Sequence, residues 1–153
     1  MSDKIIDFLN KVANDLGNKQ VRIGFVEGET YPDGTSVAAV AAKNEYGEPS
    51  ERIPARPFFR NAIANNQDNW KDTIARGIRA GAPVEQVLEV VGALAASDVY
   101  ISITQLMDPA LSARTIRERQ ERGNMSTKPL EDTKTMLNSI KYQVSEIDGE
   151  EEL

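Results

Sequence analysis

The chain has 153 residues and a mass of 16.9 kDa, with a formal net charge of −6 and a pI near 4.8. This length predicts one domain with a substantial core, and the acidic balance argues against a general phosphate-binding surface. The sequence contains no Cys and no His, which excludes disulfides, thiolate nucleophiles, imidazole bases, Ser–His–acid triads and most zinc or iron sites.

Carboxylate, Lys, Tyr or Mg²⁺ chemistry remains open, but no catalytic constellation stands out along the chain. We therefore expect no enzyme, no catalytic residues, no cofactor and no metal site. No apolar run approaches the length of a membrane span, so we expect no membrane association. The N-terminus lacks the apolar region of a signal peptide, and we expect the protein to stay in the compartment where it is made.

In the first half of the chain, apolar periodicity and turn residues define the expected elements. Thr35-Ser36 is a plausible N-cap and Gly47 a stop signal for the helix between them. The very polar run 65–69 is either a solvated turn of one long helix or a break, and we favour one helix. The expected elements are a helix at 3–16, a strand at 20–26, an exposed loop at 27–34, and helices at 37–46 and 58–80.

In the second half, a long helical pattern follows Gly81-Ala82-Pro83 and ends at Asp108-Pro109. Residues 99–104 have β-branched character, but the absence of turn residues between 93 and 107 favours helix. The expected elements are a helix at 84–107, a charged helix or loop at 111–123, a linker at 123–129, a short helix or turn at 130–137 and a strand at 138–147.

These elements predict an α+β fold. A small antiparallel β-sheet, with strands near 20–27 and 138–147, is expected to pack with several helices, including the long one near 84–107. An extended arm is expected near 108–130. We expect residues 1–147 to form a single structural domain and residues 148–153 to form an acidic, disordered tail.

The segment 53–60 organises the rest of the chain. Pro54 and Pro57 fix two backbone angles and favour an extended segment that leads into a helix. Phe58 and Phe59 then point to different sides of that helix. The segment is either a proline-capped helix start with two core aromatics or a surface offered to another subunit. The candidate subunit-interface residues are Ile53, Pro54, Arg56, Pro57, Phe58 and Phe59.

For each of two charged features, the sequence allows both a structural and a functional interpretation. Arg114, Arg117, Arg119 and Arg122 form the only basic concentration, which is either a solvated helix with internal ion pairs or a contact for a partner's carboxylates. Asp98 is the one acid inside an apolar helix, and a bond to a neighbouring helix or exposure to solvent is the favoured interpretation over a catalytic base.

Several segments together resemble one family of tailed-phage proteins, the virion-morphogenesis, neck or tail-completion proteins. Residues 37–47 followed by 53–60 resemble its helix–glutamate–aromatic–glycine and IPARPF signature. Residues 111–116 look like its LSPATI segment, and 128–140 look like its KPLIDTGRLLNSI segment. The segments occur in the family's order over roughly residues 20–147. Ala113 stands where the family usually has proline, and Lys134 where it has glycine.

The resemblance implies a small α+β structural subunit at the head–tail junction or the top of the tail tube. It implies self-association into a ring, expected to be a hexamer, with neck, tail-terminator or tail-tube proteins as neighbours. The virion is the implied location, with synthesis in the bacterial cytoplasm. On these terms we expect 53–60 to build part of a heterologous interface and 108–130 to reach a neighbour.

Other interpretations stay open. The chain could be a tail terminator, a soluble binding module that uses its Arg-rich segment on an acidic partner, or, with least support, a carboxylate and Mg²⁺ enzyme. In a ring, the charge of −6 per subunit would let DNA pass without specific binding, although solubility alone explains an acidic balance equally well.

Overall fold

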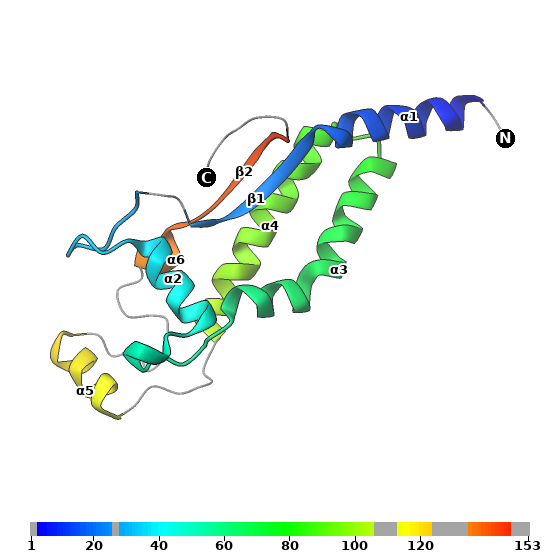
Figure 1. Ribbon diagram of the computed structural model, residues 1–153. Coiled ribbons are helices and arrows are strands. Elements are labelled where there is room, and N and C mark those ends of the chain that lie inside the picture. The colour runs from blue at the N-terminus through cyan, green and yellow to red at the C-terminus, as the bar shows by residue number, and fades with distance from the viewer. Residues whose placement is uncertain (1–2, 26–27, 106–112, 124–134, 148–153) are drawn as a thin grey trace.

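The computed structural model describes residues 3–25, 28–105, 113–123 and 135–147. Figure 1 shows an α+β arrangement in which two strands and a pair of long helices form the body. The elements are α1 (Asp3–Gly17), β1 (Lys19–Phe25), α2 (Val37–Tyr46), the short 3₁₀ helix η1 (Pro49–Glu51), α3 (Phe58–Arg79), α4 (Val84–Gln105), α5 (Ala113–Glu121), α6 (Thr135–Asn138) and β2 (Ile140–Glu146).

The sheet pairs β1, which follows α1 near the start of the chain, with β2 near the end of the described residues. β1 and β2 pair antiparallel, with Val21 opposite Val144 and Phe25 opposite Ile140. At one end of the ladder the backbone N–H of Ile147 donates to the carbonyl of Asn18 at 2.7 Å. The predicted strands are thus confirmed, with boundaries one or two residues from those expected.

Helices α3 and α4 form an antiparallel hairpin. A Cβ added to Gly77 in α3 would lie 2.8 Å from Cγ2 of Val87, so glycine lets the two helices approach closely. Farther along, the indole Nε1 of Trp70 donates to Oδ2 of Asp98 at 2.7 Å. This bond confirms the structural interpretation of Asp98, and α3 continues through its polar middle as one helix.

Helix α4 lies against the sheet. A Cβ on Gly92 would lie 2.5 Å from Cδ2 of Tyr142 in β2 and 2.9 Å from Cγ2 of Val21 in β1. Among the described helices, α4 alone is long and apolar enough, by length and composition, to cross a membrane. The expectation that no apolar run approaches that length is corrected here. Since its inner face packs on both strands and α3, we interpret α4 as the core helix.

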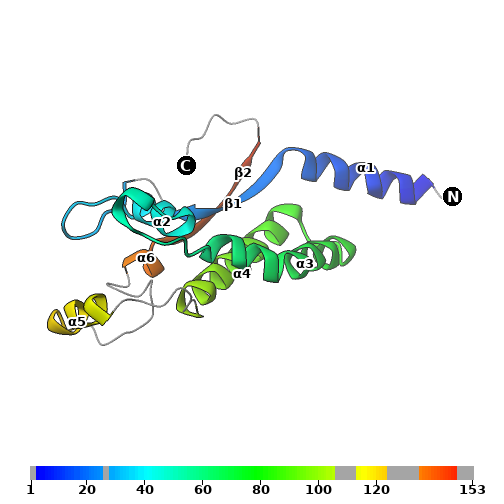
Figure 2. The same ribbon diagram turned by 60° about the horizontal axis from the view of Figure 1, so that its bottom comes forward.

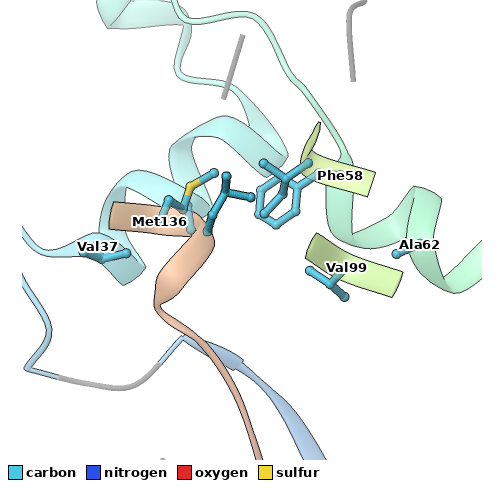
Figure 3. Packing of buried hydrophobic residues seen from close by; sticks show 8 residues of the cluster. Val37, Phe58, Ala62, Val99 and Met136 are labelled. Atoms are coloured by element: carbon cyan, nitrogen blue, oxygen red, sulfur yellow. The ribbon is translucent and has the colours of Figure 1, made fainter. Parts of the chain in front are cut away.

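The main core lies where α2, α3, α4 and α6 meet the end of the sheet. Val37, Phe58, Ala62, Val99 and Met136, from these four helices, belong to one buried cluster (Figure 3). Each of these side chains is at most 3% exposed. The short helix α6 therefore anchors β2 to the rest of the body.

Helix α1 extends away from this body, as both Figures 1 and 2 show. Around its base is a cavity of about 320 Å³ lined by Phe8, Lys11, Lys19, Ile78, Val84 and Glu85, among others. Lys19 Nζ lies 3.9 Å from Oε2 of Glu85 there. Beyond this base, α1 has no layer of the described chain over it.

The predicted arm at 108–130 falls partly outside the described residues, as do the acidic tail at 148–153 and Lys134. Within the arm, residues 113–121 form the helix α5. The helical alternative expected for 111–123 is thus confirmed by α5, and the reach of the arm toward a neighbour stays a prediction.

Candidate functional site

The segment predicted to form a subunit contact lies at a corner between α2 and α3. Gly47 ends α2 with φ 78° and ψ 165°, and its N–H donates to the carbonyl of Lys43. The loop then closes on itself, because Glu48 and Ile53 exchange two backbone hydrogen bonds of 2.9 and 3.0 Å. The N–H of Arg56 next donates to the carbonyl of Asn44. These bonds fold the loop back along α2 and bring the chain to the start of α3.

Gly47 is required at this corner for two reasons. Its backbone angles lie in a region that only glycine adopts readily, and an added Cβ would lie 2.9 Å from the backbone nitrogen of Ala55. We predict that Gly47→Ala lowers the free energy of unfolding by about 2 kcal/mol. Gly81→Ala is a matched control: Gly81 also has a positive φ, but nothing lies within 4 Å of its added Cβ.

Urea unfolding followed by circular dichroism would measure both variants. The smaller loss is expected for Gly81→Ala, because it adds backbone strain without a steric contact. Equal losses in the two variants would contradict the claim that the loop backbone is pressed against Gly47.

A buried carboxylate on α2 caps the start of α3. Glu45 is 6% exposed, and its two oxygens accept the backbone N–H groups of Phe59 at 2.8 Å and Arg60 at 3.1 Å. Pro57, at the N-cap position, makes no side-chain capping bond. Glu45 therefore replaces the missing cap from a different helix, where a negative charge also complements the helix dipole.

Arg60 completes this corner from the solvent side. Its Nε donates to Oε1 of Glu45 at 2.9 Å, and its terminal nitrogen donates to the Glu45 carbonyl at 2.7 Å. Its guanidinium carbon lies 5.2 Å from the centre of the Tyr46 ring. Tyr46 is 71% exposed, so this stacked Arg–Tyr pair forms the outer surface of the corner.

The structure places Phe58 inside the chain. It is 1% exposed, its ring meets that of Phe25 edge-on with centroids 6.0 Å apart, and its carbonyl accepts a bond from Ser102 Oγ at 2.6 Å. Phe59 is partly buried, with its ring centroid 6.3 Å from that of Phe58. The interpretation of the segment as a helix start with a core aromatic is therefore correct for Phe58.

The other candidate interface residues divide by exposure. Arg56 is buried, Ile53 and Pro57 are partly buried, and Pro54 is exposed. An interface at this segment stays a prediction. In the described chain, Pro54 and Ala55 form the outward surface of this segment, and the Arg60–Tyr46 pair lies on the same corner. Phe58 and Arg56 are buried and do not contribute to that surface.

Three of the four candidate partner-contact arginines, Arg114, Arg117 and Arg119, lie on α5, and Arg122 directly follows its end. Arg114, Arg117 and Arg122 are exposed, and Arg114 Nε lies 2.8 Å from Oε1 of Glu118. Arg122 Nε donates to the carbonyl of Glu118 at 3.4 Å. The side chain of Arg119 lies outside the described part of the chain. The pair within the helix fits the solvated-helix interpretation, and a role for these residues in partner binding stays a prediction.

The described residues offer no group of three or more acidic, His or Cys side chains that could hold a metal ion. The cavity at the base of α1 is lined by apolar side chains together with Lys11 and the Lys19–Glu85 pair.

Two features of these surfaces were missed in the sequence. The capping role of Glu45 was not assigned, although the Glu45-Tyr46-Gly47 run was noticed as part of the family resemblance. The apolar pattern of α1 was recognised as helical, but nothing in it indicated that the face would stay uncovered. Because a pattern does not name its partner, only the tertiary arrangement reveals these two features.

Comparisons with known proteins do not assign the chain. No family model, no curated protein and no solved structure matches it. The geometry and the segments described above are therefore the basis for a functional proposal.

Proposed function

We propose that this chain is a structural subunit of a tailed-phage virion, forming a ring at the head–tail junction or the top of the tail. In this role it would help to join the tail to the head and let DNA pass. The expected neighbours are neck, tail-terminator or tail-tube proteins, and the expected location is the virion after synthesis in the bacterial cytoplasm.

One observation carries the proposal: the described chain leaves bulky apolar side chains uncovered on two different helices. Ile5, Ile6, Phe8 and Leu9 of α1 and Val90, Tyr100 and Ile101 of α4 are between 43% and 56% exposed. Exposed apolar surface can mark a site where another molecule binds. A ring subunit needs two different contact surfaces, one for each neighbour, and in this proposal α1 and α4 are those surfaces.

The segments that resemble the phage family give independent support. Residues 37–47 and 53–60 are not scattered through the fold. They meet at one corner, where Glu45 caps α3 and the backbone of Ala55 packs closely against Gly47. Short matches whose residues contact one another in the fold are a better indicator of family than short matches alone.

Two alternatives have less support. A tail terminator would also form a ring, but the resembling segments belong to the neck and tail-completion proteins. A soluble binding module would rely on the α5 arginines, of which Arg114 is already paired with Glu118 in its own helix. No distance or contact in the described residues favours either alternative.

Reconstitution of the particle tests the proposal. A phage from which the gene for this chain has been deleted is expected to accumulate separate heads and tails. Addition of the purified chain is expected to restore joined, infectious particles. The count of joined particles by electron microscopy is the measurement. Normal joining in the absence of the chain would overturn the proposed function.

A further inference from the structure

The two faces of the sheet carry different side chains. Helix α4 packs along one face (Figures 1 and 2), where a Cβ added to Gly92 would meet both Val21 and Tyr142. Because the register of β1 and β2 is continuous, alternate residues point to the opposite side. We call that side the outer face, and its residues are Gln20, Arg22, Gly24, Lys141, Gln143 and Ser145.

The outer face is polar, open and cationic. Nε2 of Gln20 donates to Oγ of Ser145 at 3.3 Å across it. A Cβ added to Gly24 would have nothing within 4 Å, so the middle of this face is open. Arg22 and Lys141 occupy diagonal positions beside Gly24, roughly 7 Å apart. The outer face therefore has two cationic side chains and no acidic one, on a chain whose net charge is −6.

The face toward α4 is acidic near the end of β2. Lys19 lies directly opposite Glu146, and its Nζ is 3.9 Å from Oε2 of Glu85. The carboxylate of Glu89 accepts a hydrogen bond from Tyr142 on the same face. Three carboxylates thus surround one ammonium group there. A negatively charged segment that leaves β2 at this end is repelled from the α4 side and attracted to the outer face.

Such a segment begins where the sheet ends. The N–H of Ile147 donates to the carbonyl of Asn18 at the last rung of the ladder, and the next six residues, 148–153, include four carboxylates. Asp148-Gly149 is typical of a tight turn. After that turn, Glu150 to Leu153 span about 13 Å when extended. Arg22 pairs with Gln143, four residues before Ile147 and therefore about 13 Å along the strand.

We propose that residues 148–153 reverse direction at Asp148-Gly149 and lie over the outer face of the same chain, with their glutamates directed to Arg22 and Lys141. The composition of this segment alone predicts disorder, and the two cations of the sheet are what hold it in place. The segment acts as an internal cover that keeps other polyanions off the outer face. This inference does not depend on the proposed ring.

Cysteine pairs within one chain test the contact, since the sequence has no cysteine. Leu153→Cys with Gln143→Cys keeps every charge, and Gln143 is exposed on the outer face. The matched control pairs Leu153→Cys with Asn14→Cys, because Asn14 is exposed on α1, about 6 Å along the helix from Asn18. A segment that moves freely reaches Asn14 at least as easily.

Under oxidation at low protein concentration, we expect the Gln143 pair to close about tenfold faster than the Asn14 pair. The product is expected to be a disulfide within one chain, measured by mass and by loss of free thiols. Equal rates for the two pairs would overturn the proposal. Disulfides formed mainly between two chains would overturn it as well, since they place the segment on a neighbour.

Charge substitutions test what holds the segment. Arg22→Gln together with Lys141→Gln is expected to lower the rate of the Gln143 pair to that of the Asn14 pair. Lys71→Gln together with Arg79→Gln removes the same charge from exposed positions of α3 and is expected to leave the rate unchanged. Circular dichroism verifies that both variants fold. An undiminished rate without Arg22 and Lys141 would contradict the proposed contact.

The covering role is tested with labelled double-stranded DNA as a polyanion probe. A chain that lacks residues 148–153 is expected to bind the probe about tenfold more tightly than the full chain at low salt. Arg22→Gln with Lys141→Gln is expected to abolish this gain, whereas Lys71→Gln with Arg79→Gln keeps most of it. No gain, or equal loss in the two double variants, would overturn the covering role. The joining of heads to tails, measured separately, decides the proposed function.

Discussion

Replacing Phe58 with Ala is expected to lower the free energy of unfolding by about 3–5 kcal/mol. The side chain is 1% exposed and packs in the core with Val37, Val99 and Met136, and its ring also meets Phe25 edge-on. Loss of the ring removes this apolar contact and leaves a cavity that the surrounding side chains can fill only in part. Urea unfolding followed by circular dichroism would measure the change.

The neighbouring aromatic provides the control. Phe59 is only partly buried, so Phe59→Ala is expected to cost about 1–2 kcal/mol. A loss below about 1 kcal/mol for Phe58→Ala would contradict its place in the core. The comparison also matters for assembly, since a Phe58 variant that fails to assemble reports on folding, whereas substitutions at the exposed Pro54 or at Tyr46 report on the surface of the corner.

Replacing Glu45 with Ala is expected to lower the free energy of unfolding by about 3 kcal/mol. The substitution leaves the backbone N–H groups of Phe59 and Arg60 without their acceptors, and it removes a charge that complements the N-terminal end of α3. Because Arg60 is more than half exposed, water can solvate its guanidinium, which keeps the loss below that of breaking a fully buried ion pair. Thermal and urea unfolding would measure it.

Two controls separate the cap from the ion pair. Arg60→Ala keeps both backbone bonds to the carboxylate and is expected to cost at most about 1 kcal/mol, as exposed ion pairs do. Glu45→Gln keeps the shape of the side chain, and its loss of unfolding free energy is expected to lie between those of Arg60→Ala and Glu45→Ala. A larger loss for Arg60→Ala than for Glu45→Ala would show that the ion pair, and not the cap, stabilises the corner.

Local signals predicted most of the elements. The pattern of α4, the Ser36 cap that accepts the N–H of Ala39, and the stop at Gly47 depend on residues close in sequence. The polar middle of α3 left a break open as an alternative, and the structure shows one continuous helix, tied to α4 just beyond this run by the bond between Trp70 and Asp98. The α+β fold class follows from these elements and the pairing of two distant strands.

The site was harder to predict because its contacts join distant positions. Glu45 caps a helix that starts 13 residues later, which no pattern within either helix indicates. The proline-aromatic segment left two interpretations open, a core helix start and a surface, since burial of Phe58 depends on α4 and α6. The uncovered faces of α1 and α4 have the same apolar patterns as core helices, and only their positions in the fold show that nothing in the described chain covers them.

The central claim is that this chain is a repeating subunit that meets copies of itself through two different faces. The mass of the purified chain in solution, measured by light scattering over a concentration series, tests it most directly. We predict a closed oligomer of about six or more copies of the 16.9 kDa chain. A mass of 16.9 kDa at every concentration would contradict it.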